Sequence, residues 1–115
     1  MGNLLFETNH PENAIKYHKH ALKYNPNELQ ALIGLGNAYY DTQDPKESIK
    51  YYNKAIEIDD GLSDVHYNLG NALRDKGQLD KAIDCYKKAI ELDPKYVRAA
   101  YGGLGAALRG QGKLD

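Results

Sequence analysis

The sequence is poor in several residue types, and each shortage narrows what the protein can be. It has one cysteine, Cys85, in 115 residues, so no disulfide can form within the chain. It has no tryptophan, one phenylalanine and one methionine, whereas tyrosine occurs ten times. A tyrosine side chain is apolar along its ring and polar at its tip. Ten tyrosines therefore predict many half-buried side chains, at the edge of a core and between packed helices.

Long apolar runs and an excess of charge of one sign are also missing. No stretch approaches the roughly 18 apolar residues of a membrane-spanning helix, and the first residues lack the charged region of a secretory signal. The net charge is −1, so the basic excess of most nucleic-acid-binding proteins is absent. Together with the single cysteine, this composition predicts a cytoplasmic protein with neither a nucleic-acid nor a membrane partner.

What the chain does have is an internal repeat of 34 residues. Residues 29–62 align without gaps to residues 63–96, and 12 of the 34 positions are identical. The run Leu35-Gly36-Asn37-Ala38 recurs as Leu69-Gly70-Asn71-Ala72. Such a period indicates stacked copies of one supersecondary unit. We expect an incomplete first repeat over 1–26, full repeats over 27–60 and 61–94, and an incomplete last repeat over 95–115.

Each repeat is predicted to contain two helices, called A and B. In the first full repeat, helix A is expected from about Pro26 to Asp41 and helix B from about Pro45 to Ile58. The sequences Asn25-Pro26-Asn27-Glu28 and Asp44-Pro45-Lys46-Glu47 favour helix starts, as does Asp93-Pro94. Helix A should end on a left-handed residue, for which Gly77 and Gly112 are suited and Asn9 is acceptable. Gln43 is a poor choice there, so we expect strain or a different turn.

The glycines and alanines of the repeat have a packing explanation. We expect Gly36, Gly70 and Gly105 to lie where helices A and B cross closely, since a larger residue would push the helices apart. Tyr52 and Tyr86 should fill the space around these crossings.

The two ends of the chain fall inside repeats, and one residue is inserted near the last repeat. Met1-Gly2-Asn3 occupies the place of Leu35-Gly36-Asn37, and the chain ends where a helix B should begin. We therefore expect a fragment of a longer array. Pro94 to Leu104 spans ten residues where Pro26 to Leu35 spans nine, and Gly102-Gly103 is the expected place of the insertion. A π-bulge or a shifted helix start is predicted there.

The sequence offers little for catalysis. His18 takes the place of Tyr52 and Tyr86 in the repeat, so a packing role is favoured over metal binding. A packing role is favoured for His66 as well. A zinc site needs several cysteines and histidines at ligand spacing, whereas Cys85 is alone and is expected to be a half-buried structural thiol. No glycine-rich phosphate loop is present. We expect no enzyme activity, no metal and no cofactor. The lysines along the B helices are expected to be mostly solvated; they are Lys16, Lys50, Lys54, Lys87 and Lys88.

These residues resemble the tetratricopeptide repeat family. The signature positions are Leu35-Gly36, Tyr39, Ser48, Tyr52 and Ala55, followed by Leu69-Gly70, Leu73, Ala82, Tyr86, Ala89 and Pro94. His66 stands where an aromatic residue is usual and Asp60 where proline is usual. The resemblance covers essentially the whole chain. It implies an all-α fold, a right-handed superhelical solenoid of antiparallel helix pairs.

In this family the A helices line a concave surface that binds peptides. The resemblance places eleven residues of this chain there, and we call them the A-helix face. They are Gln30, Ile33, Asn37, Tyr40 and Asp41, then Asp64, Tyr67, Asn71, Arg74 and Asp75, and finally Arg109. Asn3, Asn37 and Asn71 form a ladder of amides that would hold a peptide backbone. The alternative is that each asparagine serves the backbone of its own stack.

Some family members clamp the acidic C-terminal tails of heat-shock chaperones with lysine, arginine and asparagine. This chain has the two asparagines, but Ile33 replaces the first lysine of the clamp. At the two cation positions of the third helix it offers Tyr101 or Gly102, then Ala106. We therefore expect no strong preference for such tails.

Two functions of different classes are compatible with the sequence. The first is a non-enzymatic scaffold that binds an extended peptide or a helix. The second is the substrate-recognition array of a larger enzyme, because Tyr67–Asn71 with Lys76–Leu79 resembles arrays attached to protein glycosyltransferases. A third possibility is self-association, in which the uncapped helix 95–109 pairs with a second copy in place of helix 1–8.

Overall fold

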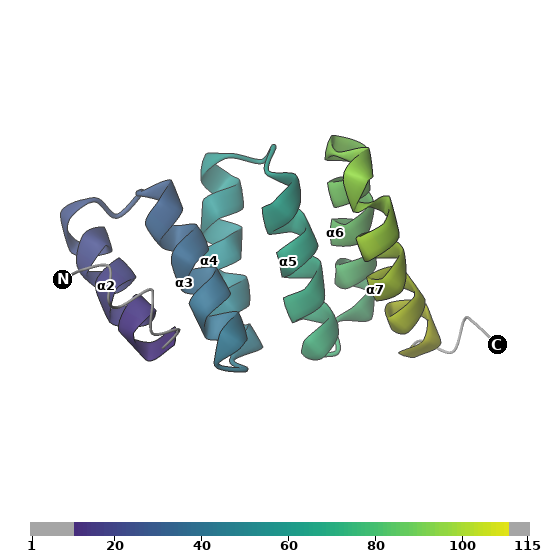
Figure 1. Ribbon diagram of the computed structural model, residues 1–115, viewed down its shortest axis with the longest axis horizontal. Coiled ribbons are helices and arrows are strands. Elements are labelled where there is room, and N and C mark those ends of the chain that lie inside the picture. Colours follow the sequence, from purple (N-terminus) through teal and green to yellow (C-terminus); the bar gives the residue numbers. More distant parts are fainter. Residues whose placement is uncertain (1–10, 111–115) are drawn as a thin grey trace. The chain divides into compact units, whose positions relative to one another are not determined.

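The structure is a computed structural model that describes residues 11–110, and it is built from paired α-helices (Figure 1). The chain divides into two compact units, residues 1–58 and 59–115. The helices of the first unit are α2 (Pro11–Tyr24), α3 (Leu29–Asp41) and α4 (Pro45–Ile58). The second unit contains α5 (Ser63–Asp75), α6 (Leu79–Leu92), the 3-10 helix η1 (Pro94–Tyr96) and α7 (Val97–Gly110).

The predicted all-α fold of helix pairs is confirmed. In the first unit α3 packs against α2 and α4, and in the second unit α6 packs against α5 and α7 (Figure 1). Residues 11–110 contain no strand. The A helices of the described residues are α3, α5 and α7, whose first residues are 34 positions apart, at 29, 63 and 97. Across the described part of the chain, no helix is both long enough and apolar enough to span a bilayer.

The turns between helices A and B contain a left-handed residue at each position where the sequence predicts one. Gln43 has φ +62° and Gly77 has φ +86°, so both residues adopt the left-handed conformation that ends helix A. The next residue in each turn donates its N–H back to the helix, from Asp44 to Tyr39 and from Gln78 to Leu73, both at 2.9 Å. Gln43 therefore has the geometry that suits glycine, and it carries the strain that the sequence predicted.

Helix α4 begins as expected, whereas α3 begins later than predicted. The Asp44 carboxylate accepts the N–H of Glu47 at 3.3 Å, and α4 starts at Pro45. Pro26 lies in a turn, and α3 starts at Leu29 with Glu28 as its cap, whose carboxylate accepts the N–H of Ala31 at 3.2 Å. The prediction of a start at Pro26 was wrong because the Asn25 side chain bonds the turn instead of opening the helix.

The inserted residue lies before Ala100 and not at Gly102-Gly103. Helix α7 runs as a regular α-helix through both glycines, so no π-bulge forms there. The buried residues show where the register changes: they are Ala31, Val65 and Ala100 on one turn, and Ala38, Ala72 and Ala107 two turns later. Both sets are spaced by 34 and then by 35 residues. The extra residue lies between the end of α6 at Leu92 and Ala100, a stretch that includes the 3-10 turn η1. Since α7 begins 34 residues after α5, the alternative of a shifted helix start stays a prediction.

Close helix crossings use the repeat's glycines. A Cβ added to Gly70 would lie 2.8 Å from the Tyr86 ring, and Gly36 faces the Tyr52 ring in the same way. The Ser48 hydroxyl donates to the buried carbonyl of Gly36 at 2.8 Å. These contacts confirm the predicted crossings at Gly36 and Gly70.

The third predicted crossing, at Gly105, stays a prediction, because the B helix that would cross α7 there lies outside residues 11–110. A Cβ at Gly105 would meet no atom of the described residues within 4 Å. Gly103 instead contacts Tyr86, as Gly34 contacts His18, so these two glycines admit the aromatic side chain of the preceding B helix. The predictions for Asn3, Asn9, Gly112 and the stretch 1–8 concern residues outside the described part.

Candidate functional site

The A-helix face is distributed over the two units. Helix α3 of the first unit carries five of its residues, and α5 and α7, which contact each other, carry six in the second unit. Six of the eleven side chains are exposed: Gln30, Asn37, Asp41, Asp64, Asp75 and Arg109. The others are half-buried: Ile33, Tyr40, Tyr67, Asn71 and Arg74. All eleven are therefore at or near the surface of their own unit.

Each asparagine of the face is held by the tyrosine of its own repeat. The Tyr86 hydroxyl donates to Oδ1 of Asn71 at 2.6 Å, and the Tyr52 hydroxyl donates to Oδ1 of Asn37. The glycine before each asparagine lets the tyrosine ring approach closely enough for this bond. A structural role was expected to involve the backbone; the structure shows a tyrosine hydroxyl as a partner.

The bond to Tyr86 fixes the orientation of the Asn71 carboxamide. With Oδ1 directed at the hydroxyl, the amide nitrogen is the end of the group that remains for a ligand. Within residues 11–110, this nitrogen has no hydrogen-bond partner. An oriented amide donor at a half-buried position is suited to a peptide carbonyl.

The Tyr86 ring is followed by two further rings, those of Tyr67 and Tyr96, and Tyr96 was missed from the sequence. The Tyr67 ring lies 6.0 Å from the Tyr86 ring and 5.5 Å from the Tyr96 ring, measured between centroids. Tyr96 belongs to η1, which lies in the stretch between α6 and Ala100 that holds the inserted residue. The ten-residue spacing from Pro94 to Leu104 was the available signal, but it did not show which side chain the extra residue would reposition.

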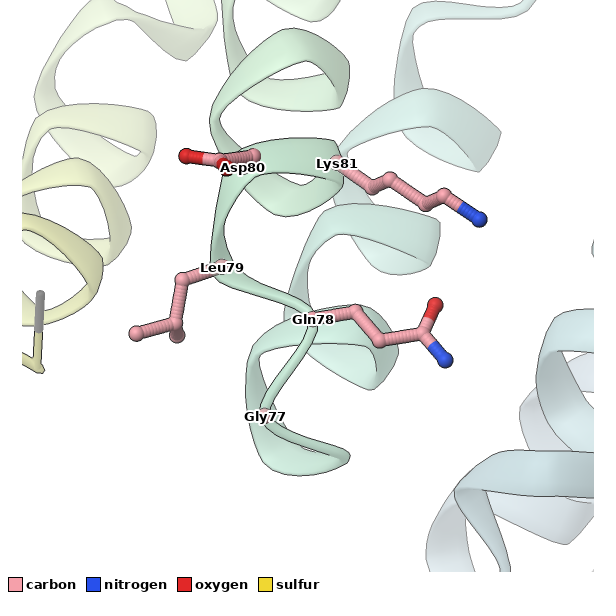
Figure 2. Close-up of a pocket in the computed structure, with 5 residues that line it drawn as sticks. All are labelled: Gly77, Gln78, Leu79, Asp80 and Lys81. Atoms are coloured by element: carbon pink, nitrogen blue, oxygen red, sulfur yellow. The ribbon is translucent and has the colours of Figure 1, made fainter.

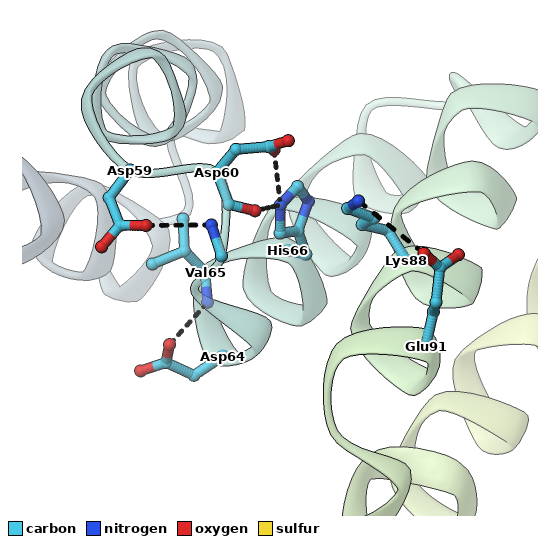
Figure 3. A network of polar contacts seen from close by, with 8 residues as sticks. Asp59, Asp60, Asp64, Val65, His66, Lys88 and Glu91 are labelled. Carbon is cyan, nitrogen blue, oxygen red and sulfur yellow. Dashed lines mark hydrogen bonds and ion pairs between the residues drawn. The ribbon is translucent and has the colours of Figure 1, made fainter.

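The charged residues of the face are partly engaged within the protein. The Asp64 carboxylate accepts the N–H of Val65 at 2.9 Å in the first turn of α5 (Figure 3). The guanidinium of Arg74 lies 3.5 Å from the carboxylate of Asp75. This exposed contact is weak, so both groups stay accessible to a charged ligand. Arg109 is exposed near the end of α7.

His66 has a packing role, as predicted, with a polar contact in addition. The residue is 6% exposed, and Nε2 lies 2.9 Å from the backbone carbonyl of Asp60 and 3.2 Å from its carboxylate (Figure 3). Asp60 stands where the family usually has proline, and it provides the polar partner of the buried imidazole.

His18 and Cys85 also fit structural roles. Burial lowers the pKa of His18, an effect that the carboxylate of Glu28 opposes. Burial raises the pKa of the Cys85 thiol to about 11, and Asp84 adds to this shift. A thiol with such a pKa is a poor nucleophile at neutral pH, which agrees with the half-buried position of Cys85. Across residues 11–110, no cluster of three or more potential ligands is arranged to hold a metal ion.

A hollow of about 330 Å³ follows the turn from α5 into α6, and five consecutive residues, 77–81, line it. Figure 2 shows Leu79 and Asp80 on one side of the chain and Gln78 and Lys81 on the other. Since these side chains diverge, the hollow lacks the converging polar groups of a small-molecule site.

Solved structures share this fold over nearly the whole chain. A crystal structure of MamA is 29% identical, with a TM-score of 0.91, and covers 98% of this chain. A MamA structure from Desulfovibrio magneticus RS-1 is 23% identical, with a TM-score of 0.89, over 98% of this chain and 63% of its own. This chain covers 66% and 61% of the first two MamA chains that it matches, less than two thirds of either.

A further structure contains a bound peptide. The first repeat domain of Spaghetti (RPAP3), bound to the HSP90 peptide SRMEEVD, is 18% identical with a TM-score of 0.88, over 96% of this chain and 87% of that domain. At this identity the likeness shows the fold alone. No curated protein sequence matches the chain.

Family models match most of the sequence. Two models described as tetratricopeptide repeats match residues 1–63 and 63–96, in agreement with the repeat, the left-handed turn residues and the crossings at Gly36 and Gly70. The chain therefore belongs to the tetratricopeptide repeat family.

Proposed function

We propose that this chain is a non-enzymatic interaction module that binds an extended peptide at the A-helix face, with Asn71 as the central contact. The observation that carries the proposal is the Asn71 carboxamide, which is oriented by the Tyr86 hydroxyl at 2.6 Å and has its amide nitrogen available. A fixed donor loses little conformational freedom when it binds, so it gains more from each contact.

The neighbours of Asn71 favour a peptide over a small molecule. Tyr67 and Tyr96 supply apolar surface beside the amide, and Arg74 supplies a cation about one helical turn further along α5. An amide donor for a backbone carbonyl, aromatic rings for a side chain and a guanidinium for a carboxylate correspond to successive groups of an extended peptide. The peptide seen with the Spaghetti (RPAP3) domain supports this class of ligand for the fold.

The decisive variant is Asn71→Asp, which keeps the oxygen that accepts from Tyr86 but replaces the amide donor with an acceptor. Peptides would be selected on the full chain from a random display library, and their Kd measured by fluorescence anisotropy. We expect at least a tenfold weaker Kd for Asn71→Asp, or about 1.4 kcal/mol.

Tyr86→Phe is the matched control. It removes the hydrogen bond that orients the amide but leaves the amide donor in place, so we expect the Kd to weaken by no more than about threefold. An unchanged Kd in Asn71→Asp, or a library that yields no binding peptide, would contradict the proposal.

Acidic chaperone tails are expected to be poor ligands of this face. Ile33 and Ala106 lie at positions where tail-binding relatives use cations. A free-acid peptide SRMEEVD should therefore compete with the selected peptides only weakly. Competition at micromolar concentration that Asn71→Asp abolishes would show this expectation to be wrong.

A further inference from the structure

A second set of chemically distinctive side chains lies in the first unit, on residues that do not belong to the A-helix face. The rings of Tyr39 and Tyr51 are stacked, with centroids 5.8 Å apart and planes 3° from parallel. The ammonium of Lys19 lies 5.7 Å from the Tyr39 centroid. Those of Lys50 and Lys54 lie 5.2 and 5.6 Å from the Tyr51 centroid. We call these five residues the lysine–tyrosine cluster.

The cluster brings cations from two helices to one place. Lys19 comes from α2, whereas Lys50 and Lys54 come from α4, and all three side chains are exposed. Tyr51 is 8% exposed, and its ring forms the floor beneath the ammonium groups of Lys50 and Lys54. The negative face of an aromatic ring attracts a cation, which keeps each lysine near the rings while its charge stays in contact with solvent.

The charge of the cluster is positive on balance. A hydrogen bond to Tyr39 raises the pKa of Lys19, so this lysine is charged at neutral pH. Glu47 lies 3.9 Å from Lys50 and offsets one of the three positive charges. A surplus of about two positive charges thus remains on this surface, although the whole chain has a net charge of −1.

The repeat itself does not require this arrangement. In the next repeat, Tyr39 corresponds to Leu73 and Tyr51 to Cys85, while Lys50 corresponds to Asp84. The fold therefore accommodates an aliphatic residue, a thiol and an acid at these places. Lys50 and Lys54 are exposed, as the sequence predicted, but their positions over Tyr51 set them apart from freely solvated lysines.

We propose that the lysine–tyrosine cluster binds an acidic, extended peptide segment of a partner protein, at a surface separate from the peptide contact at Asn71. The three ammonium groups are spread over two rings 5.8 Å apart. Alternate side chains of an extended peptide repeat at roughly 6.5 to 7 Å, so carboxylates two residues apart match this spacing. A single phosphate would engage one end of such a row, which favours the peptide.

The test uses a fluorescein-labelled peptide of alternating glutamate and glycine with both ends blocked, titrated with the full chain at low salt. Anisotropy should report saturable binding that weakens as salt is added. The double variant Lys50→Gln with Lys54→Gln should weaken the Kd at least fivefold. Shifts in the ¹⁵N–¹H spectrum should concentrate on α2 and α4.

Three controls test whether the lysine–tyrosine cluster itself holds the peptide. Lys87→Gln with Lys88→Gln changes the net charge equally on α6 and should alter the Kd less than twofold. Asn71→Asp should also leave the Kd of this peptide unchanged, which distinguishes the lysine–tyrosine cluster from the surface at Asn71. A single-stranded oligonucleotide should bind more weakly than the peptide.

The proposal is overturned if both lysine pairs weaken binding equally, since that result would indicate a general charge effect. It is also overturned if the peptide fails to bind at millimolar concentration, or if the oligonucleotide binds more tightly.

Discussion

At the scale of single residues, the same amino acid has different roles because its neighbours differ. Gly36 and Gly70 each face a tyrosine ring of the following B helix, and Gly103 faces the ring of the preceding one. Gly105 is also in the interior of an A helix, yet a side chain there would meet open space among the described residues. Glycine is thus needed at a crossing, whereas in open helix it only lowers helix propensity.

Gly70→Ala should destabilise the protein by about 1 to 2 kcal/mol. The added Cβ would lie 2.8 Å from Cε1 of Tyr86, which forces the ring to move and strains the bond to Asn71. Urea unfolding followed by circular dichroism measures this effect. Gly105→Ala is the control and should stabilise by up to about 1 kcal/mol, because no side chain of residues 11–110 opposes the gain in helix propensity. Equal stability of Gly70→Ala and the unchanged protein would contradict the prediction.

Cys85 should react slowly with thiol reagents until the pH is high. A folded-state pKa of about 11, against an ordinary value of 9.0, lowers the thiolate fraction at pH 8 roughly a hundredfold. Alkylation by iodoacetamide should therefore accelerate between pH 9 and 11 in the folded protein and earlier in urea. Because the folded-state pKa is the higher one, the thiol's contribution to stability is present at pH 7 and is lost as the pH rises through this range. Rapid alkylation of the folded chain at pH 7 would show that the thiol is not desolvated.

At the scale of elements, the turns and helix starts show how far local sequence rules extend. Gly77 and Asp44 act as those rules predict, because a left-handed residue and a side-chain cap depend on a few neighbouring atoms. The start of α3 and the place of the insertion were predicted incorrectly. Both depend on competition between turn bonds, at Asn25 and at Asp93, and the packing of the next helix.

Gln43→Gly should stabilise the protein by about 1 kcal/mol. Gln43 has φ +62°, a conformation that costs a residue with a Cβ about 1 to 2 kcal/mol and costs glycine little. The thermal midpoint should rise accordingly. Gly77→Ala, at φ +86° in the equivalent turn, should lower it by a similar amount. If Gln43→Gly lowered the midpoint, side-chain contacts of Gln43 would have to outweigh the strain.

At the scale of the whole molecule, the exposed surface of α7 bears on association between chains. Tyr101 is 62% exposed, and Leu104 and Leu108 are half-buried on the same helix. Self-association through residues 95–109 stays a prediction, and its other half, residues 1–8, lies outside the described part of the chain.

Light scattering should show an average mass that rises above that of one chain as the concentration increases. Tyr101→Ser should reduce this rise, because it removes exposed apolar area from the contact. Lys81→Gln, an exposed change on α6 and outside residues 95–109, is the control and should leave the mass curve unaltered. A constant mass of one chain at millimolar concentration would exclude this mode of association.

The sequence by itself determined the repeat, the helix pairs, the family and which helices carry the A-helix face. These features follow from periodicity and turn chemistry, which are local properties. Tertiary structure decided what the side chains do across helices. The bond between Tyr86 and Asn71, the place of Tyr96 and the position of Lys19 over Tyr39 each depend on the rotation and axial offset of two packed helices. A one-residue insertion changes both quantities, and a 34-residue period does not reveal them.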